Sequence, residues 1–288
     1  MSERLFAKLS NWLLDQPVVL ASVLDSRGAT PRKGGSRMLI ADDRCFGSVG
    51  GGLAEAQVMT AAHVLLSSHG HSSEVEIDLT GRAGAAGICG GRMRIGLRRW
   101  AGNADCELAA TIAESLHAGN PVSISAAAIA GSESHLVEPN VRLLIIGAGH
   151  CGLALHDLAH YLEFDLWVYD ERRAVLADFT HARQLSGGAS QIAHALDTQR
   201  LVFAVCVNRD YHCDVAALRV LCESPPAFIG MMGSGKRIAQ VMTALPEYAD
   251  ALANVRAPVG IEIDAQTPHE IAVSILAQLV ARRRELVR

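Results

Sequence analysis

The chain has 288 residues, which is enough for two domains of ordinary size and for a sizeable buried core. Half of the residues are apolar and only 19% are charged, so the composition excludes an intrinsically disordered chain. The 26 Lys and Arg residues nearly balance the 30 Asp and Glu residues, and the net charge of −4 argues against general binding to nucleic acid or to a membrane surface.

No segment approaches the ~18 to 20 consecutive apolar residues of a transmembrane helix. The first 16 residues are charged and amphipathic, without the apolar core of a signal peptide. We therefore expect a cytoplasmic protein that has no membrane partner. The seven cysteines are scattered and form no CxxC pair, which predicts neither a disulfide framework nor a structural zinc site.

The first half of the chain mixes short apolar runs with segments of helical periodicity. Such runs predict strands, and the 3.6-residue period predicts helices. Strands are expected at 18–24, 37–41, 74–79, 93–97 and 122–128, and helices at 53–66 and 105–116. This mixture predicts an N-terminal α+β domain that covers residues 1–135.

Turn-forming residues interrupt the apolar pattern between residues 130 and 139. Gly131 and several polar residues are followed by Pro139 and Asn140, directly before a new apolar strand. Glycine, proline and small polar residues in such a cluster are typical of a connecting loop. We place the domain boundary here, so that the second domain covers residues 140–288.

After this boundary, strands and helices alternate regularly. Strands are predicted at 142–146, 166–169, 201–207 and 227–229, and helices at 152–162, 215–222 and 235–242. A last helix begins after Thr267 and Pro268, an N-cap followed by proline at the first helical position. Apolar strands separated by helices predict a parallel sheet covered on both faces. The expected class is α/β, with a C-terminal Rossmann-like parallel sheet.

A GxGxxG pattern lies between the first strand and the first helix of this second domain. Gly147, Gly149 and Gly152 would allow a tight turn and leave helix N–H groups free for a phosphate, and His150 lies inside the same loop. Asp170 follows Gly147 by 23 residues and ends the next predicted strand, close to the position of a ribose-binding acid. The pattern predicts a Rossmann domain, which could bind a nucleotide or act only as a scaffold.

Other polar residues lie at the ends of predicted strands. Arg172 and Arg173 follow Asp170 and could favour an additional phosphate, although they could equally be solvated charges. Asp210, His212 and Asp214 follow the strand at 201–207, where ligands of open α/β sheets bind. They could serve as acid–base or binding groups, or as ordinary helix caps.

Three glycine-rich segments mark the first half of the chain. The first two combine features of anion-binding loops, namely exposed backbone amides, hydroxyls and cations, although a plain hairpin would explain the first equally well. In the third, a cysteine among glycines would be accessible for metal or sulfur chemistry, although lone cysteines are usually inert. The segments are 28–37 with Thr30 and Arg32, 47–52 with Gly50, Gly51 and Gly52 before Glu55, and 81–92 with Cys89, Gly90 and Gly91.

The order of these motifs resembles the XdhC/CoxI family of xanthine dehydrogenase accessory proteins. The matching motifs are GATPRKGGSRM, GSVGGGLAE, GICGG, IIGAGHCG, VYDERR, FIGMMGSGKR, APVGIEI and TPHEIAVSIL, and they cover nearly the whole chain. The resemblance implies a molybdenum cofactor chaperone that assists sulfuration of the cofactor together with a cysteine desulfurase. It also implies delivery to an apo-molybdenum hydroxylase such as the xanthine dehydrogenase of purine catabolism, without independent catalytic turnover.

The resemblance also assigns the cofactor-binding residues. They are Thr30, Arg32, Gly50, Gly51, Gly52, Glu55, Cys89, Gly90, Gly91, Gly147, Gly149, His150, Gly152 and Asp170, with Cys89 as the candidate for contact with molybdenum. The implied cofactor is molybdopterin with or without a cytosine nucleotide, and its phosphate suits glycine amides and arginines. Ala29, Glu262 and Asp264 depart from the family's usual Ser, Asp and Gly, and Leu53 stands where some members have Cys.

Two other functions stay open. The chain could be an NAD(P)-dependent oxidoreductase, but no Tyr-x-x-x-Lys pair follows the fingerprint and the glycine-rich segments of the first half would remain unexplained. It could be a nucleotide-sensing regulator, but the sequence has no recognisable switch segment or output domain. A homodimer is expected from the resemblance alone.

Overall fold

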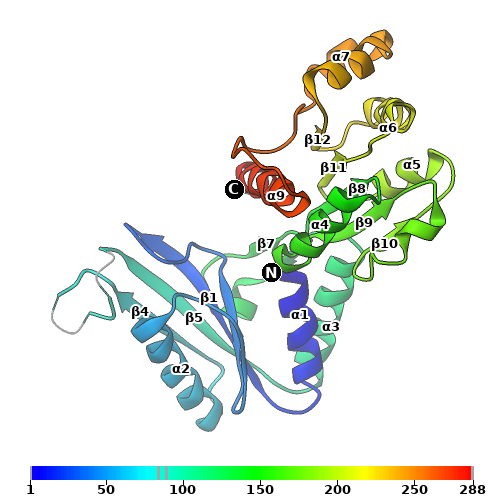
Figure 1. The fold of residues 1–288 in the computed structure, drawn as a ribbon. Coiled ribbons are helices and arrows are strands. Elements are labelled where there is room, and N and C mark those ends of the chain that lie inside the picture. Colours follow the sequence, from blue (N-terminus) through cyan, green and yellow to red (C-terminus); the bar gives the residue numbers. More distant parts are fainter. Residues whose placement is uncertain (1, 83–84, 88–89, 287–288) are drawn as a thin grey trace. The chain divides into compact units, whose positions relative to one another are not determined.

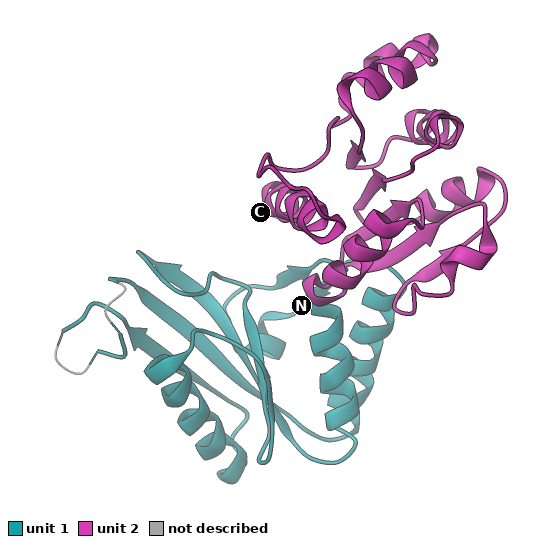
Figure 2. Ribbon diagram, viewed as in Figure 1, with its two compact units in different colours: residues 1–139 teal, residues 140–288 magenta. Residues whose placement is uncertain are grey.

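The computed structural model describes residues 2–82, 85–87 and 90–286. The chain divides into two compact units, residues 1–139 and residues 140–288, which are coloured separately in Figure 2. Within the described residues, no helix combines the length and the apolar character that crossing a membrane requires.

A five-stranded antiparallel sheet forms the centre of the N-terminal unit (Figure 1). A separate antiparallel pair of short strands follows it in the chain. In spatial order the large sheet contains β3 (Cys45–Gly47), β2 (Arg37–Ile40), β1 (Val18–Arg27), β5 (Arg92–Trp100) and β4 (Ser72–Asp78), and the small pair is β6 (Val122–Ile124) with β7 (His135–Val137).

Helices cover both faces of this sheet because successive strand residues point to opposite sides. Val19 and Ala21 of β1 pack in one apolar cluster with the second helix of the unit, whereas Val18 and Leu20 pack in another with the first and third helices. These helices are α1 (Ser2–Trp12), α2 (Gly52–Ser67) and α3 (Asn103–His117), and a 3-10 helix, η1, covers Ala126–Ile129.

The short elements of this unit differ from the sequence prediction. The strand predicted at 122–128 ends at Ile124 and gives way to η1, because consecutive alanines have little preference for a strand. Neither β3 nor β7 was predicted, since three residues are too few to show a period. Strand β7 lies inside the loop predicted at 130–139.

The C-terminal unit is built on a five-stranded sheet in which every neighbouring pair is parallel. Its strands in spatial order are β10 (Arg183–Leu185), β9 (Asp165–Tyr169), β8 (Arg142–Ile146), β11 (Val202–Cys206) and β12 (Phe228–Met231). Numbered along the chain, this order is 3-2-1-4-5, as in a Rossmann sheet, and the order reverses beside β8. The predicted α/β class, with an N-terminal α+β part, is confirmed.

Helices lie on both faces of the parallel sheet (Figure 1). They are α4 (His150–Ala159), α5 (Ser190–Leu196), α6 (Tyr211–Glu223), α7 (Gly235–Thr243), α8 (Ala249–Leu252) and α9 (Pro268–Leu286), with 3-10 helices η2 (His160–Leu162), η3 (Arg173–Leu176) and η4 (Pro246–Tyr248). One apolar cluster joins α4 and α9 to the sheet, and another joins α5, α6 and α7 to its other face. Strand β10 and helix α5 were not predicted.

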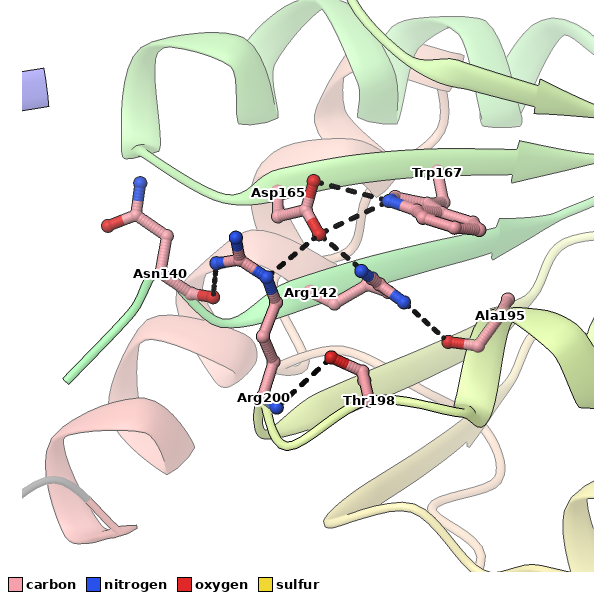
Figure 3. A network of polar contacts seen from close by, with 7 residues as sticks. All are labelled: Asn140, Arg142, Asp165, Trp167, Ala195, Thr198 and Arg200. Carbon is pink, nitrogen blue, oxygen red and sulfur yellow. Dashed lines mark hydrogen bonds and ion pairs between the residues drawn. The ribbon is translucent and has the colours of Figure 1, made fainter. Parts of the chain in front are cut away.

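A buried ionic network lies where the C-terminal unit begins (Figure 3). The Nε atom of Arg142 donates to Oδ2 of Asp165 at 2.8 Å, and Nε of Arg200 lies 3.4 Å from the same oxygen. The two arginines also donate to the carbonyl oxygens of Ala195 and Asn140. Because the network lies at the amino ends of β8 and β9, away from the edge where such sheets bind ligands, its role is structural.

Candidate functional site

Two glycine-rich loops of the N-terminal unit pack directly on one another. A Cβ atom on Gly91 would lie 2.4 Å from the carbonyl oxygen of Ala29 and 2.7 Å from Cγ2 of Thr30. A Cβ atom on Gly28 would lie 3.0 Å from the carbonyl oxygen of Gly90. The loop between β1 and β2 can therefore approach the loop between β4 and β5 only because these positions carry no side chain.

The glycine-rich segment 47–52 contacts the first of these loops and the strand that follows the second. A Cβ atom on Gly50 would lie 3.6 Å from Cγ of Pro31 and 3.5 Å from Cε of Met93. Residues Arg27 and Arg92 are paired across β1 and β5, so all three segments meet at the same end of the sheet. The structure thus brings together three segments that are separate in the sequence.

Helix α2 begins at this meeting point. Its N-cap residue, Gly51, has φ 103° and provides no side-chain cap, and Gly52 has φ 57° with no atom within 4 Å of the position that a Cβ would take. The first amides of a helix lack partners inside the helix and attract anions. The half-buried Glu55 lies in the first turn, where its negative charge favours the helix and competes with an incoming anion.

The other residues predicted for this site have different environments. Thr30 donates its hydroxyl to the carbonyl oxygen of Arg32 at 2.9 Å, which stabilises the turn, and Arg32 itself is exposed. Gly90 and Gly91 belong to the contact between the loops. Cys89 lies outside the described residues.

A cleft of about 810 Å³ lies at the carboxyl ends of the parallel strands of the C-terminal unit. Gly147, Gly149, His150 and Asp170 line it. A Cβ atom on Gly152 would lie 2.1 Å from the carbonyl oxygen of Gly147, so the fingerprint loop can close under α4 only with glycine at position 152. The four lining residues and Gly152 are thus placed together, as the fingerprint predicts.

The amino end of α4 opens into this cleft. Gly149 is the N-cap, has no side-chain cap, and has no atom within 4 Å of the position of a Cβ. His150 is exposed as the first residue of the helix. This end of the cleft therefore presents backbone amides to an anionic group.

The carboxylate of Asp170 is held by four hydrogen bonds. Its Oδ1 accepts from the backbone N–H and Nε of Arg172 at 3.0 and 2.9 Å, and its Oδ2 accepts from Nη2 of Arg172 and from the N–H of Ala148, both at 2.9 Å. Burial alone would raise the pKa of Asp170, but the hydrogen bonds from Arg172 and Ala148 hold that pKa below its usual value.

A second polar group supports the floor of the cleft. Asp214 is fully buried, and it accepts hydrogen bonds from Nδ2 of Asn208 at 3.1 Å and from Nη2 of Arg237. The side-chain oxygen of Asn208 would lie 2.6 Å from a Cβ on Gly147. Burial raises the pKa of Asp214, while Asn208 and Arg237 oppose that rise. Asp214 is therefore a structural residue that holds Asn208 against the glycine loop.

Two other candidates from the sequence lie beside this group. Asp210 caps α6 by accepting from the N–H of His212 at 2.7 Å, and His212 is exposed with its ring edge-on to Tyr211. Of the two alternatives left open for Asp210, the structure thus shows the helix cap. Asn208 was not predicted as a site residue, although its place directly after an apolar strand is a signal that could have identified it.

The cleft also contains thiols. Burial raises the pKa of both Cys151 and Cys213, and Asp210 adds to the effect on Cys213. These thiols therefore stay protonated near neutral pH and are poor nucleophiles. Within the described part of the chain, no three His, Cys, Asp or Glu residues are grouped to hold a metal ion.

Comparison with known families gives two matches. The profile of the XdhC Rossmann domain matches residues 143–279, and that of the XdhC and CoxI family matches residues 12–78. The first match covers the parallel sheet and its cleft, and the second covers the segments that contain Thr30, Arg32 and Gly50–Gly52.

Individual relatives support the same grouping. The uncharacterized protein YqeB of Escherichia coli K12 is 28% identical over 92% of this chain and 43% of its own length. A probable subunit of xanthine dehydrogenase from Bacillus subtilis 168 is 28% identical over 52% of this chain and 45% of its own length. The matches thus span less than half the length of either relative.

A solved structure shares the fold. A Bacillus halodurans protein, described as a xanthine dehydrogenase, superposes with a TM-score of 0.85 and 23% identity, covering 99% of this chain and 96% of the other. The likeness extends over both units.

Proposed function

Because the chain belongs to the XdhC and CoxI family, we propose that it assists the maturation of a xanthine dehydrogenase-type molybdenum hydroxylase. Its proposed task is to bind the molybdenum cofactor, to hold it while a cysteine desulfurase supplies sulfur, and to deliver it to the apoenzyme. The names of the Bacillus relatives, both of which refer to xanthine dehydrogenase, support this client.

The observation that carries the proposal is the meeting of the three glycine-rich segments at one end of the N-terminal sheet. Uncapped amides at Gly51 and Gly52 and the exposed guanidinium of Arg32 suit the phosphate end of a pyranopterin. When bound, the cofactor would supply the molybdenum centre that the client enzyme needs. The glycine amides and Arg32 therefore fit the phosphate end of the group that the family implies, whereas Glu55 opposes the approach of an anion.

The character of these contacts also suits a carrier. The amides of Gly51 and Gly52 and the side chain of Arg32 would hold an anion by hydrogen bonds from half-buried or exposed positions, without a covalent anchor. A carrier must release its cargo, and a partner can shift that equilibrium only by binding the two states differently. An exposed, hydrogen-bonded site allows the client to compete for the same group.

Anaerobic retention tests the binding step. Purified protein is mixed with released molybdenum cofactor, and molybdenum and pterin are measured after ultrafiltration. We expect near-stoichiometric retention, and a loss on the order of tenfold in affinity for Arg32→Gln, because a charge-assisted contact is removed. Arg219→Gln is the matched control, since Arg219 is a half-exposed arginine of the C-terminal unit that pairs with Glu247, outside the proposed site. Failure of the wild-type protein to retain pterin would refute the proposal.

Delivery requires a second measurement. The loaded protein is mixed with an apo-molybdenum hydroxylase, with and without a cysteine desulfurase, and the recovered hydroxylase activity is compared with that given by free cofactor. We expect faster activation in the presence of the loaded protein and a further gain with the desulfurase. Cys89→Ala belongs to the same assay, because unchanged retention and activation would remove this thiol from the mechanism.

A further inference from the structure

The acid that would receive a ribose in the C-terminal cleft is already occupied. In dinucleotide-binding Rossmann domains the acid after the second strand accepts hydrogen bonds from ribose hydroxyls. Here that acid is Asp170, and an ionised carboxylate offers about four lone-pair positions. Arg172 and Ala148 supply four donors to its two oxygens at 2.9 to 3.0 Å.

A ribose diol would have to replace Arg172 to reach Asp170. Neutral hydroxyls are weaker donors than a guanidinium, and Asp170 is only 7% exposed, so the exchange would leave a buried charge with poorer compensation. Arg172 is therefore the partner that Asp170 keeps. The ribose end of the cleft is then lined by a cation and not by a free carboxylate.

Arg172 has binding capacity left. Nε and Nη2 contact Asp170, which leaves Nη1 outside this pair, and the side chain is 67% exposed and lines the cleft. A planar guanidinium is well suited to a phosphate. At the other end, the uncapped amides after Gly149 and the side chain of Arg209 line the same cleft.

We propose that this cleft binds a nucleotide that carries a phosphomonoester on its ribose, and that Arg172 selects it against nucleotides with a free ribose diol. The diphosphate of such a ligand would lie at the amino end of α4, and the additional phosphate would contact Arg172. This site uses only residues of the C-terminal unit and goes beyond the cofactor-binding role proposed for the N-terminal unit.

Carboxylates in the cleft limit how it can bind an anion. Glu171, Asp178 and Asp210 also line it, so the cleft does not attract anions by a general positive field. Binding must come from close N–H contacts at the two ends, which depend on the spacing of the phosphates. Simple anions such as inorganic phosphate should accordingly bind weakly.

Matched ligand pairs test the selection in the full-length protein. NADPH is compared with NADH, and adenosine 2′,5′-bisphosphate with 5′-AMP, by calorimetry and by nicotinamide fluorescence at fixed ionic strength. In each pair the ligands differ only in one phosphate on the ribose. We expect at least tenfold tighter binding of the phosphorylated member. Equal affinity within both pairs, or no binding of any of the four, would overturn the proposal.

Single substitutions test which residues cause the preference for the phosphorylated nucleotide. Arg172→Gln should remove the preference by weakening NADPH on the order of tenfold while NADH binds equally well or better, whereas the neighbouring Arg173→Gln should keep it. Gly149→Asp should abolish binding of both nucleotides, because the new carboxylate would occupy the helix amides. That variant should remain folded, since Asp is a favoured N-cap and position 149 has open space. Retention of the preference in Arg172→Gln would contradict the assignment.

The proposal for the N-terminal site and the proposal for the cleft can be tested independently of one another. If Arg32→Gln loses pterin retention and keeps the NADPH preference, the result supports the pterin site of the N-terminal unit and does not bear on the cleft. If Arg172→Gln loses the NADPH preference and keeps pterin retention, the result supports the nucleotide site of the cleft and does not bear on the N-terminal unit. Measuring both ligands on both variants therefore identifies which site has been assigned correctly.

Discussion

Gly91 shows how a single missing side chain brings two loops together. A Cβ at this position would lie 2.4 Å from the carbonyl oxygen of Ala29 and 2.6 Å from that of Arg27, both of which are backbone atoms that cannot rotate away. We expect Gly91→Ala to separate the loops and to lower stability by about 1–3 kcal/mol, the usual cost of overpacking. Thermal unfolding and pterin retention would both report the change.

Gly34→Ala is the matched control in the same region. A Cβ on Gly34 would lie 3.8 Å from the carbonyl oxygen of Leu24, which is an ordinary contact. This variant should keep the stability and the pterin retention of the wild type. If both substitutions had the same effect, the contact between the loops would not be the cause.

The ionisation of Asp170 should make the stability of the protein depend on pH. Its pKa is lower in the folded protein than in the unfolded chain, where an Asp has a pKa of about 3.9, so its ionised form stabilises the fold. That contribution is complete above the unfolded pKa and is lost as the pH falls through the lower folded pKa. The difference in Tm between the wild type and Asp170→Asn should be positive at pH 7 and should shrink below about pH 4. A difference that stays constant down to pH 3 would contradict this explanation.

At the scale of elements, one ion pair joins α7 to the start of α6. Arg237 donates to the carboxylate of Asp214 and, at 3.1 Å, to the carbonyl oxygen of Asp210. We expect Arg237→Gln to destabilise the C-terminal unit by about 3–5 kcal/mol, because Asp214 would stay buried without its cation. Since Asp214 holds Asn208 against Gly147, the same variant should also weaken nucleotide binding. Chemical denaturation and calorimetry would measure the two effects.

Two further variants test whether the loss of stability comes from leaving a buried charge without its partner. Arg219 and Glu247 form an ion pair in which both side chains are about half exposed, so Arg219→Gln should leave the denaturation midpoint unchanged. The double variant Asp214→Asn with Arg237→Gln should recover part of the stability, because no buried charge is then left unpaired. A double variant less stable than Arg237→Gln would mean that the ion pair is not the source of the effect.

The sequence was sufficient to predict elements that have a long periodic pattern or a clear boundary signal. Strand β8, helix α4 and the start of α9 are where the patterns predict them, because each has a buried face or a recognisable cap. Strand β10 has three residues, two of them exposed, and helix α5 has seven residues, so neither offers a period that can be recognised. Short elements are stabilised by their neighbours, which a linear pattern does not contain.

The candidate sites were predictable only in part for a similar reason. The fingerprint glycines lie close together in the sequence and Asp170 ends the next predicted strand, and the Rossmann sheet brings Gly147, Gly149 and Asp170 to one cleft. The pairing of Asp170 with Arg172 depends on side-chain conformation, which spacing does not determine. The contact between Gly91 and Ala29 depends on which strands are neighbours in the antiparallel sheet, and the sequence does not give that order.

At the scale of the whole molecule, each unit has its own core. Among the described residues, the two apolar clusters of the N-terminal unit contain residues between Leu5 and Val137, and those of the C-terminal unit contain residues between Val141 and Leu279. None of these four clusters of described residues contains residues of both units. Units of this size that bury separate cores are expected to fold on their own.

The separate cores lead to a prediction about fragments. Residues 1–139 and 140–288, expressed individually, should each unfold cooperatively in thermal and chemical denaturation, because each contains its own apolar clusters. The first fragment should retain pterin and the second should retain the preference for NADPH over NADH, since each proposed site uses residues of one unit. If the fragments fold only when mixed, or if either ligand requires both, then the sites depend on contacts between the units. In that case binding of one ligand should change the affinity for the other, which titration of the intact chain with both ligands would detect.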